Sequence, residues 1–233
     1  YIYDIFSKKL TEVAPFTVDL LLPSGAENLN YVLYTDESPY KMQREWLDRL
    51  PFDIYSVNVH TGAKRLIGRS YRTAPKWSVN GKWAVMYDPI AQVWNKFDGA
   101  TGKVVNISDA IGYPMFMESY DKPAPAPAYG IAGWTADGNN VFLYDAYDWW
   151  KIDLTGERQP ECLTKGYGRK HGKSIRKMTS NIDKDVFQKD EKVIVSLWDK
   201  DTMEEGVYQL DMKGRLIKLM EGNYVYTIHR FSD

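Results

Sequence analysis

The sequence has one cysteine, Cys162, among 233 residues. A single cysteine excludes an internal disulfide framework and any zinc cluster built on cysteines. The chain also lacks an excess of either charge, because 30 Lys and Arg residues balance 31 Asp and Glu residues. A neutral chain has no strong field to attract nucleic acid or an anionic membrane, so we expect neither partner. No apolar run approaches the ~18 residues of a membrane-spanning helix.

Residues that would form a catalytic or metal site are scarce as well. A serine hydrolase needs a nucleophile on a strained turn, a His base and an acid, and the sequence has no Gly-x-Ser-x-Gly motif. The three histidines, His60, His171 and His229, are far apart and lack the spacing of metal ligands. We therefore expect no catalytic residue, no metal and no cofactor in this chain.

Charged residues cluster at two places without forming an obvious site. The segment from Lys165 to Lys177 has six Lys or Arg residues and no acid. A solvated loop is the favoured interpretation, and contact with RNA or an acidic partner is the alternative. Glu204 and Glu205 form an acidic pair, which we interpret as part of a solvated hairpin turn.

Aromatic residues are abundant, with 17 Tyr, 8 Trp and 8 Phe, or 14% of the chain. Tyrosine and tryptophan suit half-buried pleated surfaces, so their excess favours strands over helices. The hydrophobic content of 44% is ample for a packed core.

A motif with tryptophan at one end and Tyr-Asp at the other occurs twice. Trp77-Ser78-Val79-Asn80-Gly81 leads to Tyr87-Asp88, and Trp134-Thr135-Ala136-Asp137-Gly138 leads to Tyr144-Asp145 with no inserted position. After each copy comes an alternating run that ends in a polar residue and a Gly turn. That second unit occurs four times, before Thr61-Gly62, Thr101-Gly102, Thr155-Gly156 and Lys213-Gly214. Alternation closed by a Gly turn is typical of a β-hairpin.

Together the two units predict four strands per repeat, the pattern of a β-propeller blade. A four-stranded sheet has two apolar faces, and stacking sheets side by side buries both. The predicted fold is therefore an all-β, partial β-propeller with about four complete blades; a β-sandwich is the alternative. We expect one propeller region over residues 1–233, with blades at 1–13 (partial), 14–70, 71–109, 110–166, 167–221 and 222–233 (partial).

The predicted strands follow this division. They fall at 16–21, 30–35, 53–58 and 64–69; at 74–78, 83–87, 92–98 and 103–108; at 130–135, 140–144, 148–153 and 161–164; and at 174–179, 191–197, 206–211 and 215–220. Tyr1 to Val13 is expected to supply two outer strands of a preceding blade, and Tyr224 to Phe231 the inner strand of a following one.

Two insertions interrupt the repeats. In residues 36–51, Met42, Trp46 and Leu50 are four apart and predict one apolar stripe on a short helix. A helix that covers a blade edge is favoured over one that binds a partner. Residues 109–130 contain a stiff Pro-Ala run that cannot continue a strand ladder. Glu118, Tyr120 and Asp121 in this loop are the candidate substrate-binding residues, and a solvated crossover loop is the alternative.

The Trp-to-Tyr-Asp motifs, each followed by a strand and a Thr-Gly turn, resemble the propeller repeats of prolyl oligopeptidase-family serine peptidases. The stretch Tyr129-Gly130-Ile131-Ala132-Gly133-Trp134, followed by Tyr144-Asp145-Ala146-Tyr147-Asp148-Trp149-Trp150, is similar to large secreted members from Bacteroidetes-type bacteria. The resemblance covers residues 30 to 220, and the general repeat also resembles TolB-like propellers.

The resemblance implies a non-catalytic propeller region that gates and orients peptide substrates for a C-terminal α/β-hydrolase domain absent from this chain. It also implies a parent protein that is a serine peptidase, in the periplasm or secreted. The Glu pair that holds the substrate's amino terminus in some members is not assigned to Glu204-Glu205, which lacks the surrounding aromatic residues. The alternative is a non-enzymatic TolB-like propeller that scaffolds protein partners in the cell envelope. Exposed blade edges make self-association a further expectation.

Overall fold

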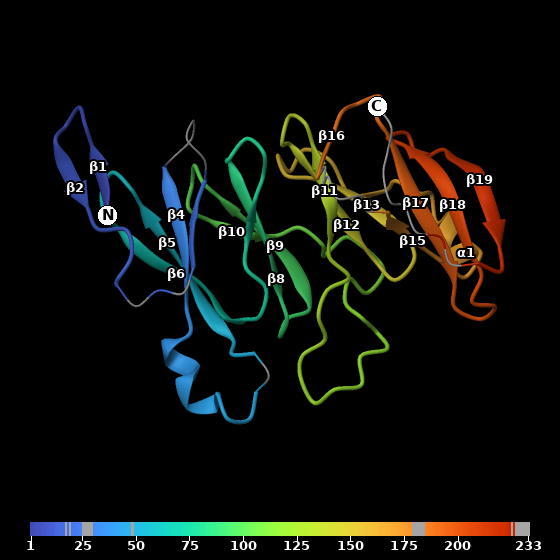
Figure 1. Ribbon diagram of the computed structural model, residues 1–233. Helices are drawn as coiled ribbons and strands as arrows, with labels where there is room; N and C mark the ends of the chain where they lie inside the picture. The colour runs from blue at the N-terminus through green and yellow to red at the C-terminus, as the bar shows by residue number, and fades with distance from the viewer. Residues whose placement is uncertain are drawn as a thin grey trace. The chain divides into compact units, whose positions relative to one another are not determined.

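The computed structural model describes residues 1–16, 18, 20–24, 30–47, 49–178, 185–224 and 226. The chain forms two compact units, Tyr1–Ile107 and Ser108–Asp233. Both are built from mainly antiparallel sheets in which most neighbouring strands follow one another along the chain (Figure 1).

The first unit contains one two-stranded and two four-stranded sheets, with orders β1-β2, β3-β4-β5-β6 and β7-β8-β9-β10. Its elements are β1 (Ile2–Asp4), β2 (Lys9–Thr11), β3 (Leu20–Pro23), β4 (Tyr31–Asp36), η1 (Ser38–Gln43), β5 (Phe52–Asn58), β6 (Lys64–Tyr71), β7 (Lys76–Trp77), β8 (Trp83–Asp88), β9 (Val93–Asp98) and β10 (Val104–Asn106). The two four-stranded sheets share one hydrophobic cluster, in which Leu33 and Ile54 of one sheet meet Met86 and Phe97 of the other.

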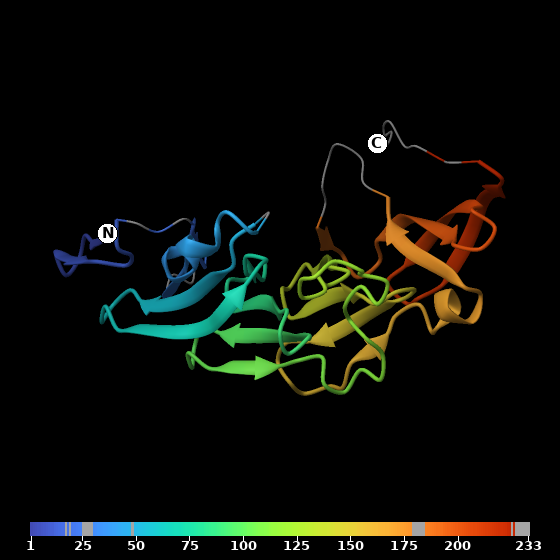
Figure 2. The same ribbon diagram turned by 90° about the horizontal axis from the view of Figure 1, so that it is seen from below.

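The second unit contains one five-stranded and one four-stranded sheet, with orders β14-β13-β12-β11-β16 and β15-β17-β18-β19. Its elements are β11 (Ile131–Thr135), β12 (Asn140–Tyr144), β13 (Trp149–Asp153), β14 (Glu161–Cys162), α1 (Tyr167–Lys170), β15 (Lys173–Lys177), β16 (Val186–Phe187), β17 (Lys192–Asp199), β18 (Glu205–Asp211) and β19 (Leu216–Gly222). Figure 2 shows the two sheets in yellow and orange. A second cluster joins them, in which Phe142 and the fully buried Trp149 pack with Val195 and Leu210.

Polar residues at the ends of strands determine where each hairpin turns. Asp98 follows β9 and its carboxylate accepts the N–H groups of Ala100 and Thr101 at 2.8 and 3.2 Å. The same turn, in which a side-chain oxygen accepts N–H groups two and three residues later, recurs at Asp4, Asn58, Asp88, Asp145 and Asp199. This local hydrogen bonding is the physical reason for the repeated polar residue in the sequence.

The two tryptophan motifs form the same hairpin. Trp77 of β7 is paired with Ala84, and Trp134 of β11 is paired with Val141, so both pairs have the same sequence separation. Gly81 and Gly138 adopt φ of 66° and 69° in the connecting turns, a conformation that favours glycine. The predicted all-β class and its four-stranded antiparallel blades are confirmed.

One strand was not predicted. Val186 and Phe187 form β16, which pairs in parallel with β11 and makes that sheet five-stranded. Gly133 allows β16 to lie this close to β11, because a Cβ atom on residue 133 would be 2.5 Å from the Phe187 ring and 2.7 Å from the Asp185 carbonyl oxygen. The segment between the predicted strands 174–179 and 191–197 therefore adds a fifth strand to the neighbouring sheet of the same unit.

The stripe predicted for residues 36–51 is wrong in two respects. The segment forms a 3-10 helix, η1, with Pro39 in its first turn and no buried residue. Met42 in η1 is 85% exposed; beyond the helix, Trp46 is 77% exposed and Leu50 is 6% exposed. Because η1 ends at Gln43, no single helix contains Met42, Trp46 and Leu50, and the three side chains do not form one stripe. The strand predicted for 224–231 lies mostly outside the described residues.

Candidate functional site

The three predicted site residues lie in the loop 109–130 of the second unit. Glu118 and Asp121 are exposed and Tyr120 is half-buried. An isolated bridge between Phe116 and Ala128 pinches the loop into a hairpin-like excursion. The structure brings Glu118 to the base of this excursion, where its N–H donates to the Tyr129 hydroxyl at 3.3 Å.

Two tyrosines of this loop lie against arginines from the basic segment 165–177. The guanidinium carbon of Arg169 is 3.9 Å from the centre of the Tyr113 ring. That of Arg176 is 5.3 Å from the Tyr129 ring and 4.7 Å from the Tyr144 ring. Cation–π contacts of this kind attach both ends of the loop to the sheets.

Asp145 pairs with Arg169, the arginine that contacts Tyr113 of the loop. Its carboxylate is fully buried and closes the β12–β13 turn by accepting the N–H groups of Tyr147 and Asp148 at 2.7 and 2.6 Å. Its second oxygen accepts the Trp150 indole N–H at 3.0 Å and forms an ion pair with Arg169 at 3.1 Å. Four donors therefore satisfy this carboxylate.

Asp148, three residues later, is 1% exposed and holds the next segment of the chain. It accepts the Thr164 hydroxyl at 2.6 Å and the N–H groups of Gly168 and Arg169 at 2.9 and 3.0 Å. Gly168 is required there, since a Cβ atom would lie 2.6 Å from the Tyr147 carbonyl oxygen. The two aspartates thus fix both the backbone and the side chain of Arg169.

Arg176 is the second half-buried cation. It donates to the backbone oxygens of Ile175, Asp145 and Ala146 at 2.8 to 3.1 Å. Burial lowers the pKa of its guanidinium, and the nearby Tyr144 and Asp145 oppose that shift. Arginine stays protonated in proteins, so Arg176 remains a cation. Together, Asp145, Asp148, Arg169 and Arg176 form what we call the charged cluster.

A cavity of about 390 Å³ lies beside the charged cluster. It is lined by Tyr113, Asp145, Asp148, Trp150, Cys162, Gly166, Arg169 and Lys170. Burial raises the pKa of the Cys162 thiol, so this half-buried group is held in its protonated form. We call this space the Arg169 cavity.

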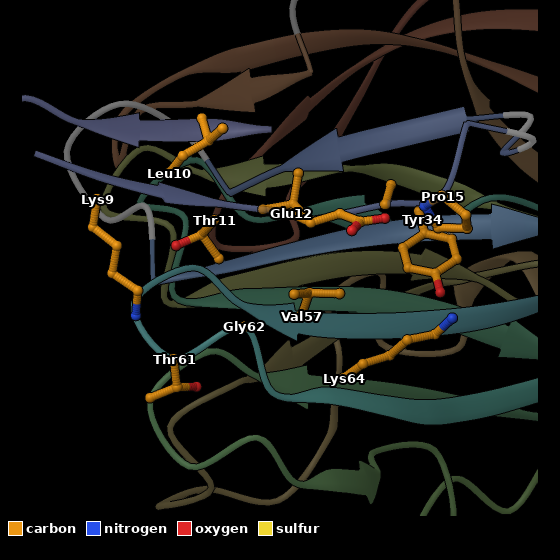
Figure 3. Close-up of a pocket in the computed structure, with 12 residues that line it drawn as sticks. Lys9, Leu10, Thr11, Glu12, Pro15, Tyr34, Val57, Thr61, Gly62 and Lys64 are labelled. Atoms are coloured by element: carbon orange, nitrogen blue, oxygen red, sulfur yellow. The ribbon is translucent and has the colours of Figure 1, made fainter.

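A second cavity, of about 440 Å³, lies in the first unit between the segment 9–15 and the strands β4, β5 and β6 (Figure 3). Buried Val13, Tyr34 and Val57 form part of its lining. The Lys64 ammonium lies 4.9 Å from the centre of the Tyr34 ring and 4.4 Å from that of Tyr55. Burial raises the pKa of Tyr34, and Lys64 opposes that shift. The lining mixes these apolar residues with the charged residues Lys9, Glu12 and Lys64.

The described histidines have structural partners. His60 lies 3.2 Å from the Asn30 side-chain oxygen, and His171 stacks on Tyr167 with ring centres 4.1 Å apart. His229 lies outside the described residues. Within the described ranges, no group of three His, Cys, Asp or Glu residues can hold a metal ion.

The solvated-loop interpretation of residues 165–177 is wrong for four of its basic residues. Arg169 and Arg176 belong to the charged cluster, and Lys173 and Lys177 pair with Glu221 and Asp185. The charged cluster itself was not predicted. The sequence contained one sign of the cluster. The turn after Asp88 has no aspartate equivalent to Asp148, and the basic segment 165–177 comes after Asp148.

No protein-family model and no curated protein sequence matches the chain. Similar solved structures include the β-propeller domain of the Trilobed protease from Pyrococcus furiosus, with 13% identity, 87% of this chain and 56% of that chain covered, and a TM-score of 0.43. Dipeptidyl peptidase 4 from Porphyromonas gingivalis has 10% identity, coverage of 94% and 34%, and a TM-score of 0.45. TolB from Acinetobacter baumannii has 12% identity, coverage of 85% and 53%, and a TM-score of 0.38.

The chain spans 34% to 56% of the lengths of these three proteins. In the part of the chain that the structure describes, neither η1 nor α1 is long and apolar enough to cross a membrane.

Proposed function

We propose that this chain is the non-catalytic propeller region of a serine peptidase of the prolyl oligopeptidase family. In the parent protein it would gate and orient peptides for a C-terminal α/β-hydrolase domain outside this sequence. The sequence resemblance of the tryptophan motifs to that family supports the proposal, and so does the blade architecture of the chain.

One structural observation supports this function above the others: the loop 109–130 is attached at both ends. Tyr113 and Tyr129 contact Arg169 and Arg176, which the buried aspartates and backbone oxygens hold. A loop attached in this way presents Glu118, Tyr120 and Asp121 in a reproducible place, which is what a peptide-orienting surface needs.

The full-length parent protein provides the test. We expect it to cleave chromogenic peptide substrates and to be labelled on a serine by a fluorophosphonate. Replacing Glu118 by Gln and Asp121 by Asn should raise KM about threefold to tenfold with kcat nearly unchanged, because such contacts contribute to binding in ground and transition state alike. A parent protein that neither cleaves peptides nor reacts with the fluorophosphonate would refute the proposal.

The same proposal places the parent protein in the periplasm or outside the cell. Fractionation of the source bacterium with an antibody to this chain tests the location. Recovery in the cytoplasmic fraction would contradict it.

Exposed apolar residues favour a second candidate function, a TolB-like scaffold for protein partners. Ile217, Leu219 and Met220 on the outer strand β19 are 39% to 51% exposed. Such an edge can pair with a second chain. Light scattering of the 233-residue chain should then show dimers or larger species that Leu219→Lys converts to monomers. The coding sequence after Asp233 separates the two functions, since only the peptidase requires a Gly-x-Ser-x-Gly motif with later Asp and His.

A further inference from the structure

In the described part of the chain, the two carboxylates that line the Arg169 cavity already accept hydrogen bonds from the protein, whereas most side-chain N–H groups of Arg169 have no acceptor. Asp145 accepts four hydrogen bonds and Asp148 accepts three, all from groups of the protein. Arg169 has five side-chain N–H groups, and within the described residues it uses one of them, on Asp145. A ligand that enters therefore meets free donors, and an amine would find little acceptor capacity.

Arg169 is held ready to bind. Its side chain is 29% exposed, paired with the buried Asp145, and lies against the rings of Tyr113 and Tyr147 at 3.9 and 5.0 Å. Neither tyrosine accepts a hydrogen bond from Arg169 in the described part of the chain, so these contacts hold the guanidinium without using its N–H groups. Little conformational entropy remains to be lost when a ligand binds.

Lys170 supplies a second positive charge beside it. Its side chain lines the same cavity, is exposed, and forms no salt bridge within the described part of the chain. Asp145 and Asp148 have lost nearly all contact with solvent and are satisfied by their donors. The two basic side chains are therefore the charged groups that a ligand can reach.

Aromatic rings form the wall of the cavity. The centres of the Tyr113 and Trp150 rings are 6.1 Å apart, with an angle of 48° between their planes. This pair offers apolar surface next to the cationic groups, and a cavity of about 390 Å³ is at the small end of ligand sites. The fitting ligand is thus an anion with an apolar group attached, rather than a bare inorganic ion.

We propose that the Arg169 cavity binds the carboxylate of a peptide, with the Arg169 edge and the Lys170 ammonium on the oxygens and the neighbouring apolar side chain against Tyr113 and Trp150. A planar carboxylate matches the fork of a guanidinium. This inference deepens the proposed function by naming a ligand group and rests on it only for the peptide nature of the ligand. Binding is a property of the 233-residue chain, so it is measured without the hydrolase domain.

The test compares three probes on the 233-residue chain: N-acetyl-Gly-Phe with a free carboxylate, the same peptide as its C-terminal amide, and inorganic phosphate. Titration calorimetry gives the dissociation constant. Labelling of Cys162, the chain's one cysteine, by a maleimide reports the location, because Cys162 lines the cavity. The free carboxylate should bind and slow labelling, and the amide should do so at least about tenfold more weakly, the usual effect of losing a charge-assisted pair.

Two variants and one control complete the test. Lys170→Gln should raise the dissociation constant about threefold to fivefold, and Arg169→Lys, which loses the planar fork, about tenfold. Lys192→Gln is the matched control, since Lys192 is exposed on β17 and outside the cavity. The Lys170 side chain has no ion-pair or hydrogen-bond partner among the described residues, so Lys170→Gln remains informative even if Arg169→Lys fails to fold.

The outcomes separate cleanly. Equal binding of carboxylate and amide, or unchanged binding by Lys170→Gln, would overturn the proposal. Protection of Cys162 by phosphate as strong as that by the peptide would overturn the carboxylate assignment in favour of a general anion site. Carboxylate binding in a chain whose parent protein shows no peptidase activity would leave this site standing and remove the proposed function.

Discussion

Two hairpin turns follow the same residue pair, Tyr87-Asp88 and Tyr144-Asp145, and have different surroundings. Asp88 accepts the N–H groups of Ile90 and Ala91 at 2.9 and 3.0 Å and is half-buried. Asp145 accepts the equivalent N–H groups, is fully buried, and also binds Trp150 and Arg169. The two turns thus share the same pair of backbone hydrogen bonds, and Asp145 has Trp150 and Arg169 as additional partners.

The lengths of the two turns explain part of this difference. Tyr87 pairs with Trp94 across the first turn, and Tyr144 pairs with Trp149 across the second, which is two residues shorter. The shorter turn places Asp148 at the start of β13, where it holds the backbone of Gly168 and Arg169. The second turn therefore gains contacts through residues that the repeat does not contain.

Neutralising the two aspartates should show the largest contrast. Asp145→Asn removes a buried charge that Arg169 needs, and breaking a buried pair typically costs about 3–5 kcal/mol of unfolding free energy. Asp88→Asn keeps an oxygen for its turn and should cost less than about 1 kcal/mol. Urea unfolding of both variants measures the difference. Equal losses would mean that burial of Asp145 adds nothing to the shared turn.

The backbone contact at Gly168 should give the next largest effect. Gly168→Ala places a Cβ atom 2.6 Å from the Tyr147 carbonyl oxygen and 2.7 Å from that of Lys173, so we expect a loss of about 1–3 kcal/mol. Gly112→Ala is the control, because a Cβ atom there meets nothing within 4 Å. Thermal unfolding compares them. An unchanged melting temperature in Gly168→Ala would show that α1 is not held against the turn.

The tyrosines before the two aspartates should make stability fall at high pH. Burial raises the pKa of both Tyr87 and Tyr144 to about 12, from an ordinary value of 10. A pKa raised in the folded state stabilises the protein fully below pH 10, and this contribution is lost as the pH rises from 10 to 12. Tyr87→Phe and Tyr144→Phe should each reduce the loss of stability over that range.

Melting temperatures at increasing pH, with absorbance of tyrosinate on the same samples, test this expectation. Tyr3→Phe is a suitable control, because Tyr3 is 55% exposed. Ionisation of Tyr87 and Tyr144 near pH 10 in the folded protein would contradict it.

The smallest expected effect concerns the loop 109–130. Tyr129→Phe removes the hydroxyl that accepts the Glu118 N–H, at an expected cost of about 1 kcal/mol. Faster amide hydrogen exchange at Glu118 is the measurement. Tyr120→Phe, in the same loop, should leave that exchange rate unchanged. Equal exchange rates in the two variants would show that Tyr129 does not hold the loop.

Local patterns allowed much of the fold to be predicted. Alternation and Gly turns located β8, β9, β12 and β13 to within about one residue, because register and turns depend on neighbours in the sequence. The spacing of Met42 and Trp46 misled, because the segment forms a short 3-10 helix that ends at Gln43, before Trp46.

The sequence patterns could not predict contacts between segments that are far apart in the chain. β16 adds to β11 from about 50 residues away, and Gly133 gave no sign of which strand would approach it. Asp145 appeared to be one more turn residue, and its partner Arg169 appeared to be solvated, until the fold placed them together. The candidates Glu118, Tyr120 and Asp121 remain a prediction, whereas the Arg169 cavity follows from the arrangement of the charged cluster.

A double-mutant cycle between Asp145 and Arg169 tests the central claim most directly. The unfolding free energies of Asp145→Asn, Arg169→Gln and the double variant give the coupling between the two side chains. A charge-assisted pair with a buried carboxylate predicts a coupling of about 1.5–3 kcal/mol. Losses that add to within about 0.5 kcal/mol would mean that the two residues act independently, and the charged cluster would not be what holds Arg169 at its cavity.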